Sequence, residues 1–143
     1  MKTDKEIIFS LEDYTAIIKI NRPPHNFFDT KLISQIADIL EEMDNENQCR
    51  SIILCSEGKN FCAGADFSKS NFTNGDNIYE NLYKQALRLF RTKKPIIASI
   101  QGAAIGGGLG VALAADFRIT CKEAKFSANF GKLGFHQGFG TTI

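Results

Sequence analysis

The first third of the chain changes from short alternating apolar runs to an apolar pattern with helical spacing. Residues 7–11 and 14–20 are β-branched, partly alternating runs separated by Glu12 and Asp13, a pattern typical of a β-hairpin. Across residues 30–45 the apolar side chains recur every three or four positions, which predicts an amphipathic helix. Asp29 is the expected N-cap of that helix.

Further strands and helices alternate along the rest of the sequence. Apolar strands are predicted at 51–55, 95–100 and 117–121, and a second amphipathic helix at 78–91. Residues 102–115 are apolar on every side and predict a buried helix, whereas the glycine-rich residues after 121 predict no regular element. This alternation predicts a single α/β domain over residues 1–143.

Composition excludes several classes of function. The 17 basic and 16 acidic residues give a formal charge of +1 without a long basic run, so we expect no nucleic-acid partner. No apolar stretch approaches the roughly 18 residues that a membrane span needs, and no export signal is visible at the start. We therefore expect no membrane partner and a cytoplasmic location. The four cysteines lack metal-ligand spacing, so no metal site is predicted.

Two segments rich in glycine and alanine are candidates for ligand contact. Residues 61–66 read FCAGAD and residues 102–110 read GAAIGGGLG, so both expose main chain that small side chains cannot cover. Close packing of a helix on a strand explains such segments equally well, and both interpretations stay open from composition alone. Neither a dinucleotide fingerprint nor a Walker motif fits these residues.

Three motifs taken in order resemble the enoyl-CoA hydratase/isomerase (crotonase) superfamily. They are NRPPHNFFD, FCAGADF and PIIASIQGAAIGGGLGVALAADFRI, and the similarity extends to the last residue. The resemblance implies a crotonase-like spiral of ββα units that binds acyl-CoA thioesters in fatty acid metabolism. It also implies that the backbone amides of Ala65 and Gly107 form an oxyanion hole that stabilises an enolate.

The resemblance also implies which residues contact the substrate. We expect no cofactor beyond the coenzyme A moiety of the substrate. The positions that the motifs assign to the substrate and its CoA moiety are His25, Ala63, Ala65, Asp66, Phe67, Ser68, Gly106 and Gly107.

The sequence departs from the superfamily at the acid–base residues. Hydratases of this superfamily use two glutamates, whose positions here are Gly110 and Phe130. Neither residue can transfer a proton, so classical hydration by paired carboxylates is not expected, although the resemblance still implies an enzyme of the lyase or isomerase type. His136 is a candidate replacement, with a hydrogen bond inside its turn as the alternative role. A decarboxylase, a thioester hydrolase or a non-catalytic acyl-CoA-binding protein are the other functions considered.

Three further expectations concern nearby side chains and the extent of the chain. Asp66 and Asp116 are interpreted as structural anchors, and Tyr83 as a packing residue that could reach the acyl group. The resemblance implies a core nearer 200 residues, so the spiral is expected to be incomplete at the C-terminus, without the helical trimerisation region. A full-length protein is expected to form a homotrimer or hexamer.

Overall fold

A five-stranded sheet forms one wall of the molecule in this computed structural model, which describes residues 5–66, 78–134 and 136–142 except for the side chains of 78 and 79. The strand order is β1-β2-β3-β4-β6, and only the β1–β2 pair is antiparallel. The strands are β1 (Ile7–Glu12), β2 (Thr15–Ile20), β3 (Ser51–Ser56), β4 (Ile96–Ile100) and β6 (Phe117–Thr120). The predicted hairpin and the predicted α/β class are both confirmed.

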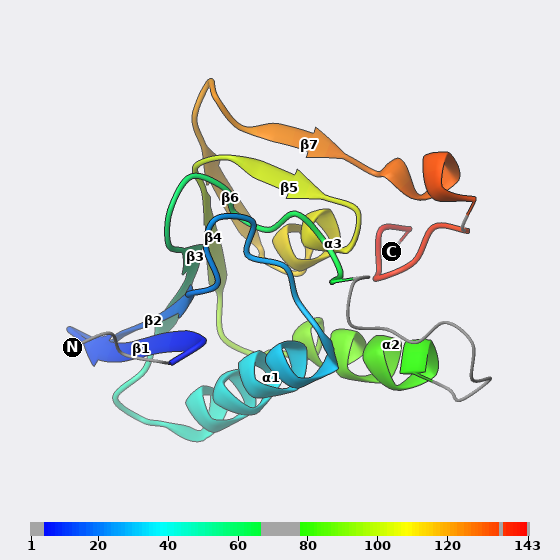
Figure 1. The fold of residues 1–143 in the computed structure, drawn as a ribbon. Coiled ribbons are helices and arrows are strands. Elements are labelled where there is room, and N and C mark those ends of the chain that lie inside the picture. The colour runs from blue at the N-terminus through cyan, green and yellow to red at the C-terminus, as the bar shows by residue number, and fades with distance from the viewer. Residues whose placement is uncertain (1–4, 67–77, 135, 143) are drawn as a thin grey trace.

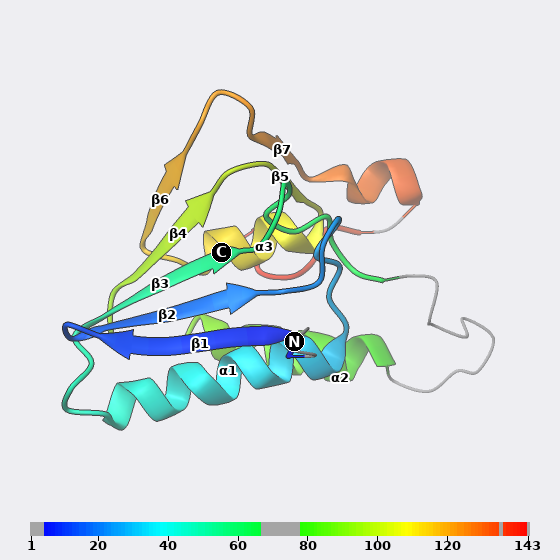
Figure 2. The ribbon, with the colours of Figure 1, turned by 60° about the vertical axis from the view of Figure 1, so that its left-hand side comes forward.

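Three helices lie on the same side of this sheet, as Figures 1 and 2 show. They are α1 (Thr30–Asn45), α2 (Ile78–Leu89) and α3 (Gly107–Leu113). The Asp29 carboxylate accepts a hydrogen bond from the backbone N–H of Leu32 at 2.9 Å, so the predicted N-cap of α1 is confirmed.

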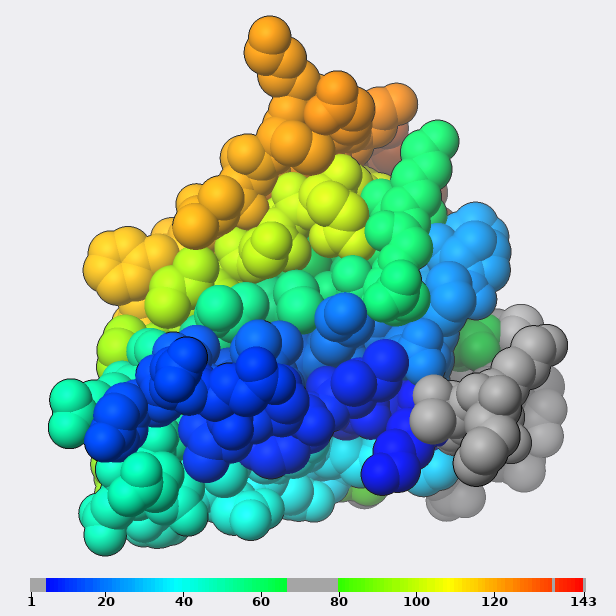
Figure 3. Space-filling view, turned by 90° about the vertical axis from the view of Figure 1, so that its left-hand side faces the viewer, coloured from blue at the N-terminus to red at the C-terminus, as the bar shows by residue number. Residues whose placement is uncertain are grey.

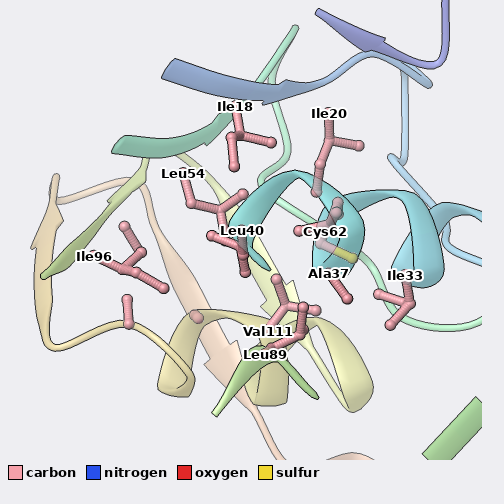
Figure 4. Close-up of a cluster of buried hydrophobic side chains, with 14 of the residues drawn as sticks. Ile18, Ile20, Ile33, Ala37, Leu40, Leu54, Cys62, Leu89, Ile96 and Val111 are labelled. Atoms are coloured by element: carbon pink, nitrogen blue, oxygen red, sulfur yellow. The ribbon is translucent and has the colours of Figure 1, made fainter. Parts of the chain in front are cut away.

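The hydrophobic core lies between the sheet and the helices. In β2 every second residue is buried, which places Ile18 and Ile20 on the helix side of the sheet. Figure 4 shows these side chains and Leu54 of β3 facing side chains of all three helices, among them Leu40, Leu89 and Val111. Complete burial of one such side chain contributes about 1.5–3 kcal/mol.

A short second sheet corrects one prediction. Residues expected to begin the buried helix instead form β5 (Ala103–Ile105), which pairs in parallel with β7 (Lys125–Ser127), and α3 starts only at Gly107. An uninterrupted apolar stretch has no period that separates helix from strand, so the composition could not locate this boundary. Strand β7 and the 3₁₀ helix η1 (Asn129–Leu133) were not predicted, because their residues are mostly exposed or half-buried and follow no apolar period.

The other face of the large sheet carries an apolar row. Ile17, Ile53, Ile97 and Phe117 are neighbours in register across four strands, and Phe117 is 62% exposed. Figure 3 views this side of the molecule, where the strands appear as successive colour bands with no helix lying across them. We call these four residues the apolar row.

Candidate functional site

The first glycine-containing segment lies between two neighbouring stretches of main chain. Cys62 pairs with β5 through hydrogen bonds from its N–H to Ala103 O (2.8 Å) and from Ile105 N–H to Cys62 O (3.0 Å). On the other side, the Ala63 N–H donates to His25 O at 3.0 Å. The small side chains of this segment therefore permit close main-chain pairing, one of the two roles considered for it.

Ala65 has a different hydrogen-bonding status from its neighbours. Phe28 N–H donates to Gly64 O at 3.0 Å, and Asp66 N–H donates to Phe28 O at 2.9 Å. Within the described part of the chain, the Ala65 N–H has no hydrogen-bond acceptor. It is thus a main-chain donor that a ligand could use.

The second segment turns sharply from β5 into α3. Gly106 has φ +56° and ψ −121°, a conformation that a side chain would strain, and its N–H donates to Ser127 O of β7 at 2.8 Å. The N–H groups of Leu109 and Gly110 donate to Gly106 O, which starts the helical pattern. Gly107 lies in the first turn, where an amide has no intrahelical acceptor, and the described residues supply no other.

The two segments run in register, so the predicted amides lie at matching positions. Cys62 and Ala104 form a parallel bridge, and Ala65 and Gly107 each follow that bridge by three residues. Both residues line one cavity of about 670 Å³, which is bounded by α2, η1, the start of α3 and residues 136–142. The structure therefore brings the two predicted residues to the same site.

The cavity wall is mainly apolar. None of the described residues that line it is an Asp, Glu, Lys or Arg, and its titratable members are Tyr83 and His136. Such a wall suits an uncharged acyl group. The side chains that define it include Phe28, Leu82, Leu87, Phe130, Leu133 and Phe139.

His136 lines the cavity mouth and is itself exposed. Its Nδ1–H donates to Gln137 O at 2.8 Å, which is the within-turn hydrogen bond considered as its alternative role. In a neutral ring this bond leaves Nε2 as the proton acceptor, so the geometry is compatible with general-base chemistry as well.

The two positions where hydratases carry glutamates differ in their relation to the cavity. Phe130 lines it with its ring, whereas Gly110 does not reach it. A Cβ built on Gly110 would lie 2.4 Å from Phe139 O and 2.5 Å from Phe139 Cδ1. Phe139 therefore fills the space that a side chain at position 110 would enter.

The remaining residues singled out in the sequence divide into four groups. Ala63 and Gly106 line the cavity, whereas His25 is exposed and neither it nor Asp66 belongs to the lining. Phe67 and Ser68 lie outside the described residues. Asp116 is a structural anchor as predicted, because its carboxylate accepts from Ile96 N–H at 2.8 Å.

Phe139 and Asn129 are lining residues that sequence reasoning missed, and Tyr83 was interpreted as a packing residue although it also lines the cavity. For Phe139 a signal existed, since a large aromatic residue between Gly138 and Gly140 indicates a close approach of main chain to other groups. Asn129 and Tyr83 have no comparable signal, because only the folded chain brings η1 and α2 to the cavity.

Among the described residues, neither a reactive Cys62 thiol nor a metal cluster is supported. Burial raises the pKa of Cys62 to about 12, so this thiol is a poor nucleophile at neutral pH. The described residues contain no group of three or more His, Cys, Asp or Glu side chains placed to hold a metal ion. In the same part of the chain, no helix has the length and apolar character to cross a membrane.

Comparison with known proteins gives a consistent result. Residues 12–143 match the family model described as enoyl-CoA hydratase/isomerase. The chain is 34% identical over 140 residues to a probable enoyl-CoA hydratase of Mycobacterium tuberculosis, covering 95% of this chain and 55% of that protein. It is 33% identical over 141 residues to a short-chain-enoyl-CoA hydratase of Clostridium acetobutylicum, covering 95% of this chain and 54% of the relative.

The solved structures agree with this similarity. Enoyl-CoA hydratase subunit I of Geobacillus kaustophilus superposes with a TM-score of 0.88 at 29% identity, covering 95% of this chain and 54% of the other. The chain thus spans about half the length of the relatives that it matches.

Proposed function

Because the chain belongs to the enoyl-CoA hydratase/isomerase family, we propose that it binds an acyl-CoA thioester through the backbone amides of Ala65 and Gly107. One observation carries the proposal: both residues line the same cavity, and neither N–H has an acceptor among the described residues. The thioester oxygen would accept both hydrogen bonds, with the acyl group in the apolar cavity.

The proposed chemistry is stabilisation of negative charge on the thioester oxygen, as an enolate in a decarboxylation or as a tetrahedral intermediate in a hydrolysis. Negative charge that develops on the thioester oxygen is stabilised by preorganised donors, and one such donor contributes about 3 kcal/mol in comparable sites. Gly107 adds to this effect because the start of a helix carries partial positive charge. Backbone donors need no rearrangement when the charge appears.

The reaction type follows from what the wall lacks. The usual hydration needs carboxylates to transfer protons, but positions 110 and 130 carry Gly and Phe, and the described lining contains no Asp or Glu. We therefore propose chemistry with less proton transfer. It is either a decarboxylation, in which loss of CO2 forms the enolate without a base, or a thioester hydrolysis, in which His136 is the available base for the attacking water.

Binding without turnover is the second candidate, and the same lack of carboxylates favours it. Titration of the 143-residue protein with butyryl-CoA and with free CoA measures the contribution of the acyl group. Crotonyl-CoA hydration and product analysis on thioester panels, repeated with His136→Gln, then separate enzyme from binder. We expect butyryl-CoA to bind more tightly than free CoA. We also expect that crotonyl-CoA is not hydrated.

Each result has a defined meaning. Equal affinity for CoA and butyryl-CoA would contradict the acyl site. Rapid hydration would contradict the role assigned to Gly110 and Phe130. Turnover that His136→Gln abolishes supports an enzymatic function. Binding without any product supports a non-catalytic acyl-CoA-binding function. For a full-length protein we further propose a homotrimer or hexamer.

A further inference from the structure

Phe139 has an unusual place in the fold. Its side chain is 3% exposed, yet it lines the cavity, and its ring lies 5.0 Å from the ring of Phe28, with 44° between the two planes. Its backbone has φ +56°, which costs a residue with a side chain about 1–3 kcal/mol. The fold thus maintains this ring in a strained segment at the cavity.

Neighbouring glycines leave room for the segment that carries this ring. A Cβ on Gly138 would lie 2.5 Å from the Tyr83 hydroxyl oxygen, and one on Gly140 would lie 2.4 Å from the Phe90 ring. Together with Gly110, which faces Phe139 itself, these close approaches show that the segment packs tightly against α2 and α3. A ligand that displaced the Phe139 ring would disturb this packing.

The ring also lies beside Gly107, the residue whose amide we assign to the thioester. A Cβ on Gly107 would be 3.3 Å from Phe139 Cδ2 and 2.5 Å from the tip of Phe28. A thioester oxygen bound to the Gly107 N–H would bring the first acyl carbons next to this aromatic pair. These carbons would meet a rigid apolar surface in the place where hydratases carry a carboxylate.

We infer that Phe139 is a specificity-determining residue that admits straight-chain acyl-CoA thioesters and disfavours those branched at the carbon next to the carbonyl. This inference rests on the proposed function, because it needs the thioester at Gly107. A flat ring packed on Phe28 fits an unbranched chain and resists an added methyl group.

Butyryl-CoA and isobutyryl-CoA test this inference, because they have the same atoms and charge and differ only in branching. Calorimetric titration of the wild-type protein, Phe139→Ala and Phe139→Met gives the affinity ratio of the two ligands for each. Methionine keeps most of the side-chain volume of phenylalanine, but its flexible side chain can change conformation when a ligand binds. We expect both substitutions to raise the ratio of the isobutyryl-CoA affinity to the butyryl-CoA affinity about fourfold. This factor corresponds to the free energy of burying one methyl group.

Phe61→Leu is the matched control, because Phe61 is fully buried but does not line the cavity. It should leave the ratio within about twofold of wild type. An unchanged ratio in whichever Phe139 variant folds, judged by circular dichroism, would overturn the specificity role and leave the proposed function standing. Failure of the wild-type protein to bind either ligand would overturn both.

Discussion

Single residues decide which chemistry the cavity can host, and Gly110 is the clearest case. In the sequence, glycine at this position indicates the loss of the glutamate side chain that hydratases carry there. In the structure the lost side chain is replaced by Phe139, whose main chain and ring both approach the Gly110 Cα. The absence of a carboxylate at this position is therefore built into the packing of the residues around it.

Gly110→Ala tests this packing. The new Cβ would lie 2.4 Å from a main-chain oxygen that cannot rotate away, so the segment around Phe139 must shift. We predict a loss of about 1–3 kcal/mol in the free energy of unfolding, measured by urea denaturation. Gly131→Ala is the control, since nothing lies within 4 Å of that position, and equal stability of the two variants would contradict the packing.

Asn26 is a second residue whose role only the structure reveals. In the sequence it directly follows His25, a predicted substrate contact, but its own side chain is fully buried. It donates to Glu57 O at 2.8 Å and to Asn60 O at 2.7 Å, and accepts from Arg22 N–H at 2.9 Å. These bonds join residues 22–28, which flank Ala65, to the turn that precedes the site.

Asn26→Ala should therefore destabilise the protein strongly. Arg22 N–H and Glu57 O lose their partner, while Asn60 O loses one bond and keeps the one from Ser56 Oγ at 3.0 Å. A left-handed φ of +51° also suits alanine poorly. We predict a loss of about 2–4 kcal/mol in the free energy of unfolding. Asn45→Ala, which removes one exposed bond to Glu41 O at 2.9 Å, serves as the comparison and should cost much less. Similar losses in both variants would rule out this role.

At the scale of elements, the site depends on how segment 62–66 docks on β5 and α3. A Cβ on Gly108 would lie 2.1 Å from Cys62 O, so the helix and the segment touch through bare main chain. The Cys62 thiol is enclosed in this contact and is 0% exposed. The rate at which a thiol reagent modifies Cys62 consequently measures whether segment 62–66 separates from β5 and α3.

Cysteine alkylation at pH 8 measures that opening. With its pKa raised to about 12 by burial, the Cys62 thiol stays protonated at this pH, and it is 0% exposed in the docked state. We predict that iodoacetamide labels exposed Cys121 first and Cys62 only under denaturing conditions, as followed by peptide mass spectrometry. Equally fast labelling of both cysteines in the native protein would mean that the segment is not docked.

At the scale of the whole molecule, the predicted crotonase-like fold is confirmed, and one face of its large sheet is apolar. The apolar row crosses four strands in register, and Ile119 on β6 adds a side chain that is 65% exposed. Exposed apolar surface of this kind is typical of protein interfaces. The proposed homotrimer or hexamer would have this face available for contact.

Sedimentation velocity can test whether this face associates. We predict that the 143-residue protein self-associates at micromolar concentration and that Phe117→Lys shifts it toward monomer, since a charge in an apolar interface loses hydration without gaining a partner. Phe9→Lys is the control, because Phe9 is 42% exposed on β1 but pairs in register with Ile18, whose side chain points to the helix side. A monomeric wild-type protein would contradict the prediction.

The sequence by itself determined the α/β class, the hairpin, the α1 boundaries with the Asp29 cap, and the family. Apolar periodicity and local capping are properties of neighbouring residues, so they can be read without the fold. The Ala65 and Gly107 positions came from short motifs in the same way. The boundary between β5 and α3 did not, because residues 102–115 have no polar positions to mark a period.

Only the tertiary structure decided how the site is closed. Asn129, Tyr83 and Phe139 come from η1, α2 and the segment after η1, and they meet at one cavity through contacts between residues far apart in sequence. The match between Gly110 and Phe139 has the same origin, as does the burial of Asn26. Such contacts depend on the relative placement of elements, which the local pattern of apolar and polar residues does not encode.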